Sequence, residues 1–176
     1  MKKVMLLTIF AALMMISSAA VAQTASGTLT VTATVNGSIN LVFNSNAAGV
    51  ALSSGAGTNA ATLAFGNVSA FGAIPAGIVR STTATTFTVS SAVDVLVTKT
   101  NSASANYTLK AQLGSADAVN NWAVGGVAVS NAAQSTLTAT GAYGANSNFP
   151  VAITVPFTTA SGTLISNTIN YVATAN

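Results

Sequence analysis

The chain has 176 residues, with five lysines or arginines, two acidic residues and no histidine or cysteine. Hydrophobic residues make up 51% of it, which excludes a disordered polyelectrolyte. Charged residues make up only 4%, so a phosphate-tracking surface of clustered lysines and arginines is excluded, and nucleic acid is not an expected partner. The side chains that usually supply a nucleophile with its base, a proton carrier or a metal site are scarce. We therefore expect neither an enzyme nor a cofactor or metal site.

Residues 1–22 have the pattern of a cleavable export signal. Lys2 and Lys3 give a positive start, 4–16 is an almost unbroken apolar run, and Ala20-Val21-Ala22 is a small-x-small cleavage pattern before Gln23. An apolar run of this length is short for a retained membrane anchor, which needs about 20 residues. The sequence predicts a secreted or cell-surface protein without a stable membrane span after cleavage, and a single domain over 23–176.

Few charges remain after the leader. Its two lysines account for part of the +3 net charge, so the remainder carries +1. Soluble β proteins usually protect their sheet edges with charged side chains or proline. A nearly uncharged exported β protein is therefore expected to associate with copies of itself. The charged residues after the leader are Arg80, Asp94, Lys99, Lys110 and Asp117.

The first segment after the leader alternates apolar and hydroxyl side chains. Apolar residues at 29, 31, 33 and 35 alternate with threonines at 28, 30, 32 and 34, which predicts a strand with one apolar face. A two-residue hairpin at Asn36-Gly37 would put this apolar row and the next one, 39–43, on opposite faces. We therefore expect one long strand, bent at Gly37 or straight, over 29–43.

Further strands are predicted by period-two alternation between turn residues. No segment has the stripe of an amphipathic helix backed by charges. Seven to nine short strands indicate an all-β fold, an antiparallel sandwich or a barrel. The predicted strands lie near 61–65, 87–97 (two strands), 107–113, 127–129, 136–139, 151–157 and 165–173.

Four features together resemble bacterial pilin-type and spore coat protein U-like secreted domains. These are the alternating segment 28–35, the element Leu63-Ala64-Phe65-Gly66-Asn67-Val68, the stretch 150–157 and the closing stretch 162–171. The resemblance implies an immunoglobulin-like β-sandwich that is one strand short and is completed by the N-terminal segment of a neighbouring subunit. It also implies an assembly chaperone or an outer-membrane export factor as a partner.

The residues permit this assembly independently of the resemblance. A strand added to another subunit must be extended, near a terminus and apolar on one side. The leading segment, residues 23–35, meets these conditions, and Leu29, Val31, Ala33 and Val35 are its expected interface residues. An ordinary first strand within its own sheet explains the alternation equally well. The leading expectation is a structural subunit of an extracellular filament, pilus or coat that polymerises by β-strand addition.

A monomeric surface adhesin or carbohydrate-binding module is the alternative. Trp122 and Tyr143 lie among asparagines and glycines, where flat aromatic rings beside amides are suited to sugars. Such aromatics also commonly cover a core beneath a loop. A small outer-membrane barrel is a third possibility, opposed by an aromatic content of only 6%.

Overall fold

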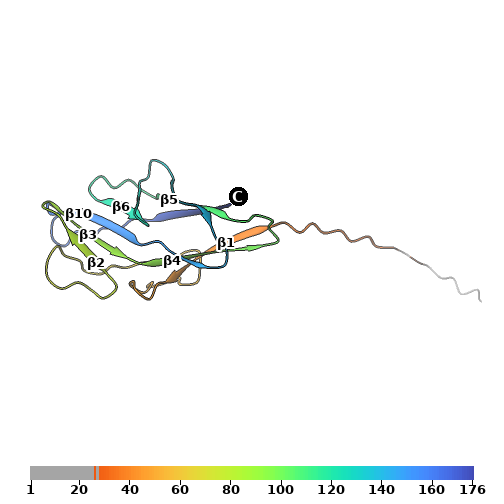
Figure 1. Ribbon diagram of the computed structural model, residues 1–176, viewed down its shortest axis with the longest axis horizontal. Coiled ribbons are helices and arrows are strands. Elements are labelled where there is room, and N and C mark those ends of the chain that lie inside the picture. Colours follow the sequence, from red (N-terminus) through yellow and green to blue (C-terminus); the bar gives the residue numbers. More distant parts are fainter. Residues whose placement is uncertain (1–25, 27) are drawn as a thin grey trace, which may run out of the picture. The chain divides into compact units, whose positions relative to one another are not determined.

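The computed structural model describes residues 26 and 28–176, and these residues form eleven β-strands and no helix (Figure 1). Residues 35–176 make one compact unit, which contains every strand. The strands are β1 (Ser38–Ser45), β2 (Val79–Thr82), β3 (Thr86–Ser91), β4 (Val93–Thr100), β5 (Tyr107–Leu113), β6 (Asn121–Val124), β7 (Val127–Val129), β8 (Ser135–Gly141), β9 (Asn146–Asn148), β10 (Val151–Pro156) and β11 (Ile169–Ala175).

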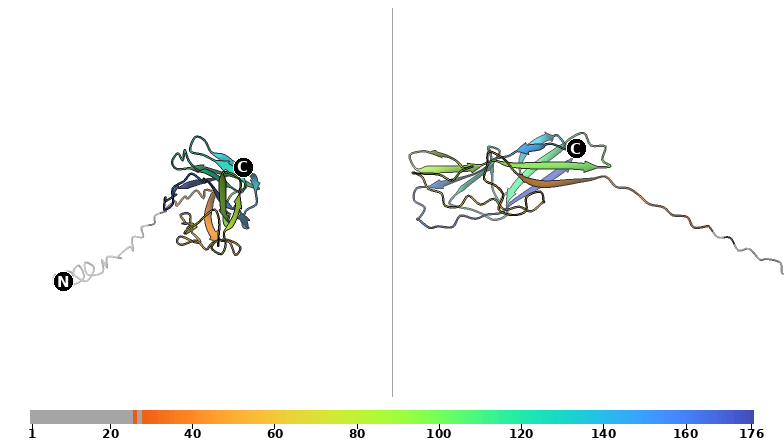
Figure 2. Two further views of the ribbon diagram at one scale, coloured as in Figure 1. Left: turned by 90° about the vertical axis from the view of Figure 1, so that its left-hand side faces the viewer. Right: turned by 90° about the horizontal axis from the view of Figure 1, so that it is seen from below.

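All strand pairs are antiparallel, and they form three sheets. The strand orders are β1-β4-β9, β2-β3-β10-β6-β7 and β11-β5-β8. The first two sheets continue into each other, because only Ala92 separates β3 from β4 and the amide of Phe149 donates to the carbonyl of Val93 at 2.8 Å. Figure 2 shows the same strands from one end and from below.

The sheet β11-β5-β8 covers both of the other sheets, so the unit is a two-layer sandwich. One half of β5 joins the larger core cluster with β3, β6, β7 and β10, and the other half joins a second cluster with β4. The alternation of β5 explains this placement, because every second residue from Tyr107 to Leu113 is buried. The all-β sandwich-like fold predicted from the sequence is confirmed. The buried apolar residues are Ile78, Val89, Val93, Val95, Val97, Tyr107, Leu109, Ala111, Leu113, Trp122, Val124, Val129, Val151, Ile153 and Val155.

Eleven strands are more than the seven to nine expected. The break at Ala92 between β3 and β4 agrees with the two strands predicted over 87–97, whereas β9, which is separated from β10 at 149–150, has no predicted counterpart. Pro150 lacks an amide proton, so the ladder cannot continue through it. The short strands β2 and β6 have no clear alternation in the sequence, and no strand was predicted at either place.

The long first strand predicted over 29–43 is wrong in its first half. β1 starts at Ser38, which pairs with Thr100, the last residue of β4. The chain turns after Thr100, where Asn101 has a φ of 53°, so no neighbouring strand is available to the residues before Ser38. A Cβ at Gly37 would lie 2.7 Å from the carbonyl oxygen of Asn101, which explains a glycine at this start. The predicted face of 39–43 is correct, since Leu41 and Phe43 pack on the core.

The strand predicted at 61–65 is also wrong, because Thr62 forms only an isolated bridge with Ser54. The last strand starts at Ile169 rather than at Ile165. The predicted export signal, 1–22, lies outside the described residues. In the part of the chain that is described, no helix is long and apolar enough to span a membrane.

Candidate functional site

The strand β11 lies at an outer position of its sheet and has one unpaired edge. All seven of its residues pair with β5, from Ile169 opposite Leu113 to Ala175 opposite Tyr107. The strand, Ile-Asn-Tyr-Val-Ala-Thr-Ala, contains neither a charged residue nor a proline. Those are the residues with which β proteins usually prevent strand addition. We call the unpaired side of β11 the β11 edge.

The core is incompletely covered beneath the β11 edge. Ile169, Tyr171 and Ala173 point toward the core yet are only half-buried. Their neighbours Leu109 and Ala111 on β5 are completely buried. Further apolar area is thus available for burial along this side of the sandwich, where each Å² removed from water stabilises by about 25 cal/mol.

Strand β1 of the opposite layer lies along the same side of the sandwich. The rings of Phe43 on β1 and Tyr171 on β11 meet edge to face, with their centroids 5.0 Å apart. Burial raises the pKa of the Tyr171 hydroxyl above its ordinary value. The two outer strands therefore approach each other at the middle of β11 through an aromatic contact.

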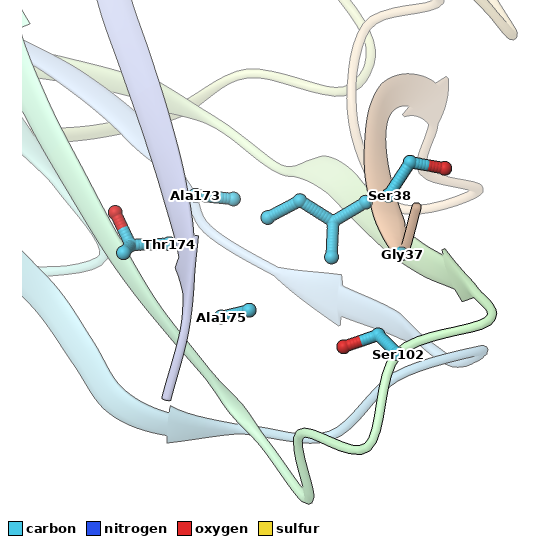
Figure 3. Close-up of a pocket in the computed structure, with 7 residues that line it drawn as sticks. Gly37, Ser38, Ser102, Ala173, Thr174 and Ala175 are labelled. Atoms are coloured by element: carbon cyan, nitrogen blue, oxygen red, sulfur yellow. The ribbon is translucent and has the colours of Figure 1, made fainter. Parts of the chain in front are cut away.

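Beyond this contact the two strands leave a hollow of about 370 Å³, which is formed by the start of β1, the end of β11 and Ser102. Figure 3 shows the methyl groups of Ala173 and Ala175 pointing into it and Thr174 pointing the other way. Small side chains thus line the β11 side of the hollow, and Ile39 is the bulky apolar residue on the β1 side. The hollow has room for side chains supplied from outside the sandwich.

The other outer strands are less suited to pairing with an added strand. The β1 edge is occupied at Phe43, whose amide donates to Thr58 at 2.9 Å and whose carbonyl accepts from Gly57 at 2.7 Å. β7 and β9 have three residues each and β2 has four. The pairing of β8 with β5 has register shifts, which distort an edge. The β11 edge is thus the longest regular free edge among residues 28–176.

No family model, curated protein or solved structure matches this chain.

The predicted interface residues of the leading segment are exposed and lie outside any strand. The exposed fractions are 88% for Leu29, 80% for Val31 and 73% for Val35, and Ala33 is exposed as well. Figure 1 accordingly draws no strand arrow before β1. The segment thus carries three large, exposed aliphatic side chains, all at odd-numbered positions.

The structure does not bring together the two aromatic residues considered for sugar binding. Trp122 is only 7% exposed, packs in the larger core cluster and donates from Nε1 to Oδ2 of Asp117 at 2.8 Å. Tyr143 packs against the second cluster, and its hydroxyl donates to the carbonyl of Asn106 at 3.1 Å. Both polar groups are thus used within the fold; the Trp122 ring is buried, whereas the Tyr143 ring is only half-buried.

The two acidic residues are also separated. Asp117 binds its own loop, with Oδ1 accepting from the amides of Val119 at 3.0 Å and Asn120 at 2.9 Å. Asp94 accepts from the side-chain amide of Asn46 at 2.7 Å. Each carboxylate is held by neutral donors of its own surroundings, so their contacts are those of structural residues.

Sequence reasoning identified the last strand but not its open edge. The alternation of apolar and polar residues shows that a segment forms a strand. Whether that strand lies at the edge of its sheet depends on how strands far apart in the sequence pair with each other. One sequence signal was available: the stretch 169–175 lacks charge and proline on both of its faces.

Proposed function

We propose that this protein is the structural subunit of an extracellular filament, pilus or coat, and that copies join by β-strand addition. In this proposal the leading segment of one subunit pairs with the β11 edge of the next. The observation that carries it is the combination of a free, regular, uncharged edge over a half-covered core with an exposed segment that is apolar on alternate positions.

The physical basis is the burial of two apolar surfaces that the isolated chain leaves in water. An extended strand added to a sheet edge gains backbone hydrogen bonds, and its alternate side chains bury against the core. Three aliphatic residues of the leading segment would each contribute about 1.5 to 3 kcal/mol on full burial. Because charges are few, repulsion between neighbouring copies would be small.

A pair of matched substitutions tests this function. Val31→Asp places a carboxylate on the apolar side of the leading segment, where burial without a partner costs several kcal/mol. Thr32→Asp places the same charge on the other side, which stays in water. We expect the unchanged protein and T32D to form polymers in sedimentation and negative-stain microscopy, and V31D to sediment as single chains.

Two results would contradict the proposal. The unchanged protein sedimenting as a single chain at high concentration would exclude polymerisation itself. Polymers of V31D as long as those of T32D would exclude the apolar side of the leading segment as the joining surface.

A further inference from the structure

The hydrogen bonds between β11 and β5 determine which backbone groups of β11 are free. The amide of Asn176 donates to the carbonyl of Asn106 at 3.1 Å, and the amide of Gly114 donates to the carbonyl of Thr168 at 2.7 Å. In an antiparallel pair, bonded residues alternate with residues whose groups point away. Even-numbered residues of β11 therefore bond to β5. The N–H and C=O groups that point to the β11 edge belong to Ile169, Tyr171, Ala173 and Ala175.

These four residues are also the ones on the core side of the sheet. Residues directly opposite each other in an antiparallel pair point to the same face. An added antiparallel strand that bonds to all four consequently turns four of its own side chains, spaced by two, toward the core. The leading segment offers such a set of apolar residues between 29 and 35, with threonines in between.

Side-chain size distinguishes the two directions in which this set can lie. The antiparallel arrangement puts bulky residues opposite small ones at three of its four positions. The parallel arrangement instead puts two bulky residues opposite each other at both positions near the start of β11. At the two positions near the end of β11, an alanine of β11 lies opposite the added strand. The antiparallel pairs are Leu29–Ala175, Val31–Ala173, Ala33–Tyr171 and Val35–Ile169, and the parallel pairs are Leu29–Ile169, Val31–Tyr171, Ala33–Ala173 and Val35–Ala175.

The hollow beside β11 favours the antiparallel arrangement. Ala173 and Ala175 line it and point into it (Figure 3). In the antiparallel arrangement Val31 and Leu29 lie opposite these alanines, so two branched side chains enter the hollow. Ala33, the smallest of the apolar set, then lies opposite Tyr171, whose large ring already contacts Phe43. Interiors are close-packed, so such complementarity separates a correct pairing from a wrong one.

We propose that the segment 29–35 of a second copy runs antiparallel to β11, with Leu29 opposite Ala175 and Ala33 opposite Tyr171. This inference rests on the proposed function and specifies its contact. The chain's own segment is a poorer occupant, because it leads directly into β1 through Asn36-Gly37. A tight two-residue turn there would pair it with β1 and put its threonines toward the core.

Engineered cysteine pairs test the direction, because the chain has no native cysteine. Opposed residues of a bonded antiparallel pair have Cα atoms about 5.5 Å apart, which is within disulfide range. Val31→Cys with Ala173→Cys is opposed in the antiparallel arrangement. Val35→Cys with Ala175→Cys is opposed only in the parallel one. Both double variants replace one valine and one alanine, so they are matched.

We expect oxidised polymers of V31C/A173C to give a ladder of covalent oligomers on a non-reducing gel and V35C/A175C to give single chains. Mixing the single variants V31C and A173C before assembly should give a disulfide between two different chains. A ladder from V35C/A175C would overturn the antiparallel direction.

If V31C/A173C formed its disulfide only within single chains, and the mixed single variants gave no disulfide between chains, the segment beside β11 would belong to the same chain. That result would contradict the proposal that a second copy supplies it. Polymers that form but cross-link in neither variant would overturn the alignment and leave the proposed function standing. If the unchanged protein does not polymerise, the proposed function itself is contradicted.

Discussion

Replacement of Tyr107 by phenylalanine should stabilise the protein. Tyr107, the first residue of β5, is completely buried in the cluster that holds Val95 and Val97 of β4. Its hydroxyl has no hydrogen-bond partner among the residues that the structure describes. A buried polar group without a partner costs about 1 to 3 kcal/mol. Phenylalanine keeps the ring and its contact with the Tyr143 ring, whose centroid lies 5.3 Å away. The Tyr107→Phe variant should therefore unfold with a free energy about 1 to 3 kcal/mol higher.

Urea unfolding followed by the fluorescence of Trp122, the single tryptophan, measures this change. With a slope of about 2 kcal/mol per molar urea, the midpoint should rise by about 0.5 to 1.5 M. Tyr143→Phe is the matched control, because the Tyr143 hydroxyl has partners in Ser104 and Asn106. Its loss should lower the unfolding free energy by about 1 kcal/mol. A lower midpoint for Tyr107→Phe would show that the hydroxyl is bonded and refute the reasoning.

Two further substitutions test other parts of the fold. Gly141→Ala should destabilise by about 1 to 3 kcal/mol in the same assay, because its Cβ would overlap Cζ of the buried Tyr107. Gly114→Ala is the milder comparison, since the nearest atom to its Cβ would lie 3.3 Å away, and it should cost less. Burial raises the pKa of Asp117, but bonds from Asn120, Trp122 and Val119 outweigh it and lower the pKa from 3.8 to about 2. A lowered pKa stabilises the fold above about pH 4, and this stability is lost as the pH falls through about 2. The stability difference between the unchanged protein and Asp117→Asn should therefore shrink between pH 5 and pH 2; a constant difference in acid titrations would contradict this.

The strands with strong alternation could be predicted from the sequence, because one of their faces is buried. The strand at 107–113 is an example: its predicted range matches β5. The half-buried end strand was predicted at 165–173 and is observed at Ile169–Ala175. Local pattern is sufficient for such strands, since each second side chain contacts the core regardless of which strands lie beside it.

The segment 28–35 shows where local pattern is insufficient. Its alternation is as regular as that of β5, yet it forms no strand, because backbone pairing needs a neighbour and β4 ends opposite Ser38. The sequence also could not place the candidate site. The open edge of β11 results from the order β11-β5-β8, which depends on contacts between residues far apart in the chain.

The few basic residues of the described chain have a consequence for digestion by proteases. Between residues 28 and 176 trypsin can recognise only Arg80, Lys99 and Lys110. Each lies within a paired strand, opposite Val89, Ile39 and Val172 respectively. A protease needs an unpaired, extended substrate, so cleavage at these bonds requires the strands to separate first. The folded part of this protein should therefore withstand trypsin for as long as its sheets hold together.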